Sequence, residues 1–387
     1  MTLTPLQAKN ALIAFQRFGL GPKIAGGLQP IGADAKAALR AEVNHPGIAA
    51  INNPGLPTYA AACREGTFDT ARAEALRRKE IAARMAKHLS VKIGFVERLV
   101  LFWSNHFSML VNKNPIIRAT IGQVERDVIR KYVLGNFADM LIGVTRSPAM
   151  LCYLDNASSI GPGSVTGLAT ALGFNENLAR EILELHTMGR EGHQTEQDVR
   201  AFTKILTGWS YVRPEEADER TNGGTQANRG QFIYRSYWHE PDLIPMMGKI
   251  YPAAGPRQAV LVMRDIARHP ATAAQLAYKL VQHFVADEPT PEMIEPIRKA
   301  FLKSGGNLKT VALALITLPQ AWSQPLTKIR TPYELTTAQF RALGFRYTEG
   351  EYPIFHQVLS VLQHMPWEAP MPTGYSDHSL DLSLIHI

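Results

Sequence analysis

The stretch from residue 175 to 209, NENLAREILELHTMGREGHQTEQDVRAFTKILTGW, constrains the fold most strongly. Apolar residues recur every three to four positions in both of its halves, which is typical of helices that pack one face on a core. Gly189 stands where a glycine would end the first helix, and Thr195 with Asp198 predicts a capping box at the start of the second. A chain built around such a pair is expected to be mainly α-helical.

The first of these helices also carries a polar stripe. At about 100° per residue, Asn177, Glu181 and Glu184 lie beside the apolar face. Arg180 is four residues from both Glu176 and Glu184, so it can bridge two carboxylates. Two interpretations stay open: a glutamate pair for acid–base chemistry or for a divalent cation, and a structural ion-pair network.

A divalent metal is the only cofactor that the sequence suggests, and its ligands are not specified. Carboxylate-bridged di-iron sites need a Glu-x-x-His pattern on one helix face. The nearest histidine here, His186, follows Glu184 by two residues and is expected to project away from the carboxylate stripe. This spacing argues against a simple di-metal site in a helix bundle.

A second polar feature is the FWSNHF stretch at 102–107. His106 continues the apolar face of a predicted helix, with Asn105 one step round it. It is either a hydrogen-bonded core histidine or a general base or ligand at a buried polar pocket. Glu181, Glu184 or Asp155 could supply the partner that a buried imidazole needs.

A third feature is the YWHE segment at 237–240, where His239 and Glu240 are expected on a loop that can reach a cleft. The flanking segments 231–237 and 246–251 are predicted to pair as a small β-hairpin. Trp209, at the end of the central stretch, is a further candidate for substrate binding.

The remaining pattern predicts one large, multi-helix domain over residues 1–378. The segments 47–69 and 157–168 are expected to be irregular, and residues 213–231 are expected to form an exposed polar loop. The final residues 379–387 resemble translated sequencing-adapter sequence, so we expect a non-native tail on a truncated metagenomic reading frame.

Composition excludes several classes of protein. The net charge of +7 is spread along the chain rather than clustered, which makes nucleic-acid binding unlikely. Two cysteines are too few for a disulfide framework, and no stretch is long and apolar enough for a membrane span. The start of the sequence lacks signal-peptide features, so a soluble cytoplasmic protein is expected.

Several stretches together resemble the bacterial domain-of-unknown-function family 1800; among them are RFGLGP (17–22), ERLVLFWSNHF (97–107), NENLAREILELHTMG (175–189), KIRTPYEL (328–335) and PTGYSD (372–377). The resemblance implies a helical fold and a bacterial origin, but no settled activity. Relatives continue with further helices after PTGYSD. Some relatives are exported, which leaves the compartment open.

These observations lead to two hypotheses. In the first, the protein is an enzyme, hydrolase-like or metal-assisted, in which His106 is the acid or base and Glu181 and Glu184 orient it or hold a cation. Arg180 would bind an anionic substrate group, and His239 would reach the same site from the hairpin. In the second, the protein is a non-enzymatic binding or assembly factor with a structural ion-pair core. A pocket beside His106 with spare hydrogen-bonding groups favours the enzyme.

Overall fold

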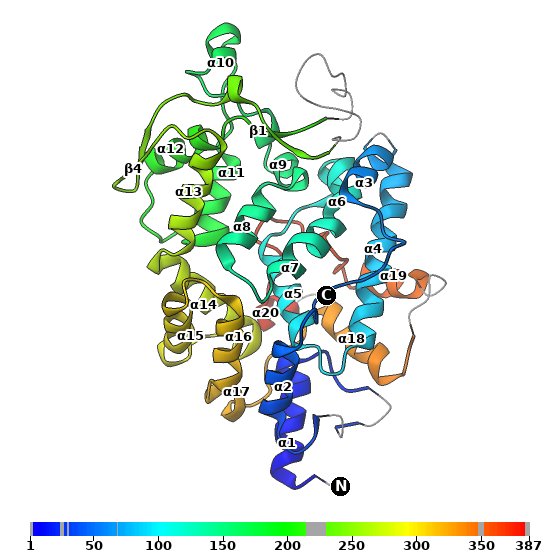
Figure 1. Ribbon diagram of the computed structural model, residues 1–387. Coiled ribbons are helices and arrows are strands. Elements are labelled where there is room, and N and C mark those ends of the chain that lie inside the picture. Colours follow the sequence, from blue (N-terminus) through cyan, green and yellow to red (C-terminus); the bar gives the residue numbers. More distant parts are fainter. Residues whose placement is uncertain are drawn as a thin grey trace.

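The computed structural model describes residues 3–23, 27–28, 31–67, 69–213, 230–346 and 352–383. Helices dominate these residues, which confirms the mainly α prediction (Figure 1). Within these ranges, none of the helices combines the length and apolar character that crossing a membrane requires. The polar loop predicted at 213–231 lies almost entirely outside the described residues.

The first part of the chain is helical and contains two π-helical turns, η1 and η4. Its elements are α1 (Pro5–Ile13), η1 (Ala14–Phe18), α2 (Ala35–Asn44), α3 (Tyr59–Gly66), α4 (Thr70–Ser90), α5 (Phe95–His106), η3 (Val111–Lys113), α6 (Pro115–Val124), η4 (Glu125–Ile129), α7 (Arg130–Tyr132), α8 (Phe137–Thr145), α9 (Pro148–Tyr153), η5 (Asn156–Ser158) and α10 (Val165–Thr170).

The middle of the chain holds the central helix pair and the short strands. Its elements are α11 (Asn177–Glu181), the π-helix η6 (Ile182–Thr187), α12 (Glu196–Leu206), β1 (Trp209–Tyr211), β2 (Phe232–Tyr234), η9 (Ser236–Trp238), β3 (Ile244–Met246) and β4 (Lys249–Tyr251). The predicted capping box is present, because Thr195 Oγ1 accepts from the Asp198 amide and the Asp198 carboxylate accepts from the Thr195 amide. Gly189 takes the expected left-handed conformation, with φ of +83°.

The described residues from 256 to 383 contain eight helices joined by loops. These helices are α13 (Pro256–Ala267), α14 (Pro270–Phe284), α15 (Pro291–Lys303), α16 (Leu308–Thr317), α17 (Gln320–Ser323), α18 (Pro332–Ala342), α19 (Tyr352–Val361) and α20 (Ser379–Ser383).

Three sequence expectations about local structure were wrong. The segment 47–69 contains α3, because Thr58 Oγ1 accepts from the Ala61 amide and caps the helix start. The segment 157–168 contains the start of α10, which Ser164 caps in the same way. The strands β2 and β4 do not pair: β1 pairs with β2, and β3 pairs with β4 across a tight turn. The glycine in that turn, Gly248, has φ of +72°, and this conformation favours the short-range pairing.

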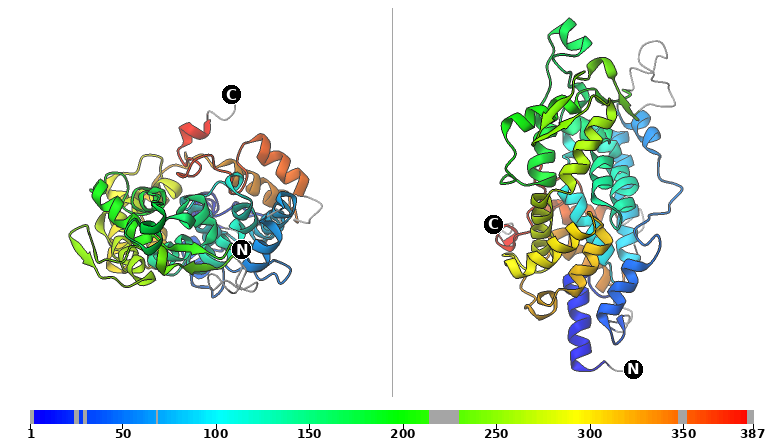
Figure 2. Two further views of the ribbon diagram at one scale, coloured as in Figure 1. Left: turned by 90° about the horizontal axis from the view of Figure 1, so that it is seen from above. Right: turned by 60° about the vertical axis from the view of Figure 1, so that its left-hand side comes forward.

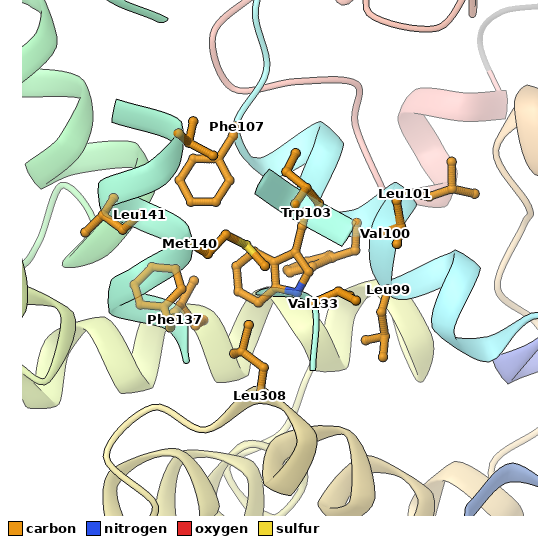
Figure 3. Packing of buried hydrophobic residues seen from close by; sticks show 14 of the residues in the cluster. Leu99, Val100, Leu101, Trp103, Phe107, Val133, Phe137, Met140, Leu141 and Leu308 are labelled. Carbon is orange, nitrogen blue, oxygen red and sulfur yellow. The ribbon is translucent and has the colours of Figure 1, made fainter. Parts of the chain in front are cut away.

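The helix α5 lies at the centre of the core. Trp103 is 1% exposed, and its ring centroid is 6.2 Å from that of Phe107 and 5.5 Å from that of Phe137. Figure 3 shows these rings with Leu308 from α16 closing one side. Clustered aromatic rings bury large apolar areas, so they contribute much of the core's stability. This packing fixes α5 and therefore fixes Asn105 and His106 at its end.

The molecule is elongated, with α1 near one end and α10 at the other (Figure 2). The segment that follows α19 crosses the region of α5 and leads to α20 (Figure 1). Asn105 joins this segment to α5, since its amide nitrogen donates to the Tyr375 carbonyl at 2.8 Å and its Oδ1 accepts from the Tyr375 amide at 2.8 Å. The end of the described chain thus forms a wall beside α5.

Candidate functional site

His106 is buried and both of its ring nitrogens are engaged. Nε2 lies 3.0 Å from the carbonyl oxygen of His186, and Nδ1 lies 3.1 Å from Nζ of Lys279. A carbonyl oxygen can only accept, so Nε2 carries the proton and Nδ1 accepts from the lysine. Burial, then Lys279 and His186, lower the pKa of His106 well below its usual value. His106 is therefore a neutral imidazole.

Lys279, on α14, is the titratable partner of His106. Burial lowers the pKa of its ammonium to about 8, and the negative charge of Asp377 opposes that effect only in part. An amine with a pKa close to physiological pH is present there in both protonation states, so it can both give and take a proton. The pair therefore places one mobile proton at the end of α5.

A cavity of about 140 Å³ opens beside this pair, and we call it the Lys279 cavity. Its lining combines one aromatic ring from α5 with polar groups, and it consists of Phe102, Asn105, His106, Lys279, Gln282, Thr373, Tyr375, Ser376 and Asp377. The residues come from α5, from α14 and from the turn at 372–377. The cavity is accordingly built where three segments distant in sequence meet.

The turn at 372–377 fits closely against α5. Gly374 has φ of +83°, and a Cβ added there would lie 2.5 Å from the Asn105 carbonyl oxygen. Only glycine meets both conditions without moving the backbone. The paired hydrogen bonds of Asn105 to Tyr375 then hold the turn as the outer wall of the Lys279 cavity.

Behind this wall, charged side chains form a buried chain of contacts. Asp377 Oδ1 lies 2.8 Å from Nδ1 of His283, and Glu334 Oε1 lies 2.7 Å from Nε of Arg98. Burial alone would raise the pKa of both carboxyl groups, but His283 holds that of Asp377 low, and Arg98 with His283 holds that of Glu334 at about 2. Both carboxyl groups are ionised at neutral pH. A further cavity of about 60 Å³ lies among His283, Glu334 and Asp377.

The residues of the predicted carboxylate stripe lie elsewhere. Arg180 forms ion pairs with Glu176 at 3.3 Å, Glu184 at 3.1 Å and Glu196 at 2.8 Å, while its side chain remains 35% exposed. Asn177 is exposed at the helix start. This arrangement is a partly exposed ion-pair cluster around one arginine.

Glu181 has a different environment from Glu184. Its Oε2 is buried and makes no hydrogen bond to any described residue. Burial, then the nearby charge of Glu184, raise its pKa. The π-helix η6 begins at the next residue, and His186 within it, rather than either glutamate, contacts His106. The even 100° spacing assumed from sequence does not hold across this turn.

His239 and Trp209 belong to a separate cluster around the strands. His239 Nδ1 donates to the Thr207 carbonyl at 2.9 Å, and the ring faces Gln258. Burial lowers its pKa. The Glu240 carboxylate accepts from the Gly163 amide at 2.9 Å, so this hydrogen bond joins the 237–240 segment to the loop that contains Gly163. Trp209 is fully buried, with the Arg146 guanidinium 5.1 Å from its ring centroid.

Of the predicted site residues, the structure brings Asn105 and His106 together at one cavity. Sequence reasoning missed Lys279 and Asp377 there, and also His283, which pairs with Asp377 behind the cavity wall. A signal was available, because Lys279 and His283 are four residues apart in an otherwise apolar helix, AYKLVQHF. Asp377 lies in the PTGYSD turn, which was noted only as a family signature.

Among the residues that the structure describes, no group of three or more His, Cys, Asp or Glu side chains is placed to hold a metal ion. The prediction of a divalent metal therefore gains no ligand set from these residues.

No curated protein matches this chain. No solved structure matches it either. A family model described as "Protein of unknown function (DUF1800)" matches residues 13–381, which is nearly the whole chain. The protein belongs to this family.

Proposed function

We propose that the protein is an enzyme that performs acid–base chemistry on a small molecule in the Lys279 cavity. The observation that carries the proposal is the contact between the Lys279 ammonium and the neutral His106 ring at 3.1 Å, at the edge of that cavity. An amine whose pKa lies near the working pH is well suited to proton transfer or to nucleophilic attack.

The neighbours of Lys279 support such a role. His106 accepts one ammonium hydrogen, which orients the amine, and the His186 carbonyl fixes the His106 tautomer. Phe102 supplies an apolar surface, and Gln282 offers a side-chain amide within the same cavity. A substrate oxygen placed there would meet the Lys279 amine as its proton donor, because the Gln282 amide nitrogen already donates to Tyr278 Oη and the Asp287 carbonyl.

Within this proposal His106 keeps the acid–base role predicted for it, as the partner of Lys279. Asn105 acts by positioning the 372–377 turn. The roles predicted for Glu181, Glu184 and His239, and the binding roles predicted for Asn177, Arg180 and Trp209, stay predictions. So does a cation at the glutamate pair. Hydrolysis is the reaction we would test first.

The alternative, a non-enzymatic binding or assembly factor, is favoured by one observation. Arg130 lies 2.9 Å from Glu97 and 3.1 Å from Glu125, and all three side chains are at most 3% exposed. A buried and charge-balanced cluster of this kind can serve structure alone.

The experiment is the hydrolysis of p-nitrophenyl acetate between pH 6 and pH 10 by wild type, Lys279→Met and Lys299→Met. Lys299 is the matched control because its side chain is 62% exposed and pairs with Glu295. We expect a rate that rises through pH 8 in wild type and in the control, and the loss of that rise in Lys279→Met. Equal profiles for all three proteins, each properly folded by circular dichroism, would favour the alternative.

A further inference from the structure

A cavity of about 270 Å³ between α1, η1, α14 and the segment before α18 has an unusual charge. We call it the arginine cavity. Its lining contains four residues that are positively charged at neutral pH and no aspartate or glutamate, and it consists of Leu12, Gln16, Arg17, Arg98, His283, Phe284, Leu326, Lys328, Ile329 and Arg330. It is a different cavity from the one at Lys279.

Two of the four cations have acidic partners behind the cavity wall. Arg98 pairs with Glu334 at 2.7 Å, and Lys328 pairs with Asp287 at 2.7 Å. These contacts neutralise about half of the positive charge around the cavity.

Arg17 and Arg330 form no ion pair with any described residue. Arg17, 4% exposed, donates to the backbone carbonyls of Ala321 at 2.6 Å and Pro325 at 2.7 Å. Arg330 Nη2 donates to the carbonyls of Phe15 at 2.9 Å and Gln16 at 3.0 Å. Carbonyl dipoles satisfy these donors, and Glu334, the partner of Arg98, offsets the charge of Arg330 only in part.

The pKa values of Arg17 and Arg330 are consistent with an excess of positive charge around the cavity. Burial, then the charge of Arg98, lower the pKa of Arg17. The same two causes lower that of Arg330 to about 10, although the charge of Glu334 opposes them. Arg330 Nη1 is also buried, and it makes no hydrogen bond to a described residue. The cavity therefore combines unbalanced positive charge with an unused charged donor.

We propose that the arginine cavity binds a small molecule through an oxyanion, a phosphate or a carboxylate, which accepts a hydrogen bond from Arg330 Nη1 and is attracted by the charge of Arg17. A guanidinium N–H forms a charge-assisted hydrogen bond with such a group, and Arg330 Nη1 is a donor that the backbone carbonyls leave free. The apolar side chains of Leu326 and Ile329, 42% and 47% exposed, line the same cavity and would contact a short apolar part of the ligand. The volume suits a small metabolite rather than a macromolecule.

This inference goes beyond the proposed function and does not depend on it. Lys279 is not part of the arginine cavity. Lys279→Met should therefore bind the oxyanion as wild type does, so that the two proposals can fail separately.

The test is calorimetric titration and thermal unfolding with inorganic phosphate and with citrate, each against sodium chloride at equal ionic strength. We expect wild type to bind at least one of the two oxyanions and to unfold at a higher temperature in its presence, because a ligand that binds only the folded state stabilises it. Tighter binding of phosphate assigns a phosphorylated ligand, and tighter binding of citrate assigns a carboxylate. Wild type that responds to neither beyond the chloride control would overturn the proposal.

Variants locate the site. Arg330→Gln should raise the dissociation constant for the oxyanion at least about tenfold, since it removes a charge-assisted hydrogen bond. Arg200→Gln is the control, because Arg200 is 70% exposed and pairs with Glu176 away from the cavity.

A second variant, Ile329→Glu, changes an exposed residue, so it should fold even if Arg330→Gln does not. Its carboxylate should compete with the ligand. Unchanged binding in Ile329→Glu, or in folded Arg330→Gln, would place the oxyanion elsewhere and overturn the assignment.

Discussion

Two buried clusters of arginine in this molecule differ in how their charges are balanced. Around Arg130, burial alone would lower the pKa of the guanidinium, but the carboxylates of Glu97 and Glu125 outweigh burial and raise it. Around Arg330, no carboxylate pairs with the guanidinium among the described residues, and its pKa falls to about 10. The first cluster is complete without a ligand, whereas the second holds more positive than negative charge.

This difference in charge balance separates the clusters that stabilise the fold from those that are candidates for ligand binding. The Arg130 cluster joins α4, α5 and η4, and its members are each within 3.5 Å of an opposite charge. Such a cluster fixes helices in place. The Lys279 and arginine cavities instead hold cations whose pKa values are depressed beside open volume. Perturbed groups of this kind gather at functional sites.

The largest effect is expected where the balanced cluster is broken. Glu97 accepts from Arg130 at 2.9 Å and lies 3.1 Å from His88, and these neighbours hold its pKa at about 2 although burial opposes them. Glu97→Gln leaves Arg130 short of a buried negative charge, which should destabilise the fold by about 3–5 kcal/mol. Urea unfolding at pH 7 measures this loss, and a loss below about 1 kcal/mol would mean that the cluster is not closed as described.

Replacing Lys279 with methionine is expected to have a smaller effect on stability, and one of opposite sign, because the buried ammonium destabilises the fold at neutral pH. Its pKa falls from 10.5 to about 8 on folding, which corresponds to about 3 kcal/mol. The unfolded chain binds the extra proton between these pH values, so the stability that this group contributes is full above pH 10.5 and is lost as pH falls through 8. Lys279→Met lacks this dependence.

The stability of Lys279→Met relative to wild type should accordingly decrease by up to about 3 kcal/mol between pH 7 and pH 10. Denaturant unfolding of both proteins across this range gives the difference directly. A constant difference would mean that the Lys279 amine titrates as in the unfolded chain.

The smallest effect is expected at Arg180. It has three carboxylate partners, but its side chain is 35% exposed and that of Glu196 is 70% exposed. Exposed ion pairs are weak and are screened by salt, so Arg180→Gln should cost no more than about 1 kcal/mol. Urea unfolding in low and in high salt measures it. A loss as large as that of Glu97→Gln would remove the distinction between surface and buried clusters.

Local features were predictable from sequence because local chemistry determines them. The cap formed by Thr195 and Asp198 and the turn at Gly189 depend on residues within one helical turn. The three π-helical segments were not predictable from an even helical period. In the one at 182–187, His186 meets His106 through its carbonyl, and the two glutamates lie on another face, as the spacing of His186 from the carboxylate stripe indicated.

The candidate site was harder to predict because its partners are far apart in the sequence. Lys279 is 173 residues from His106, and Asp377 is 94 residues from His283. Periodicity places a side chain on a helix face but does not say which distant helix that face meets. Asn105 and His106 were found because they end an apolar helix, whereas their partners required the tertiary structure.

The most direct test of the account is the pKa of the Lys279 amine in the folded protein. It can be measured from the pH dependence of reductive methylation with ¹³C-formaldehyde, read by NMR and assigned with Lys279→Met. The account predicts a titration at about 8, well below the ordinary value of a lysine amine. A value near the ordinary 10.4 of lysine would contradict it, because the amine would then be fully protonated at neutral pH and the proposed acid–base pair would not exist.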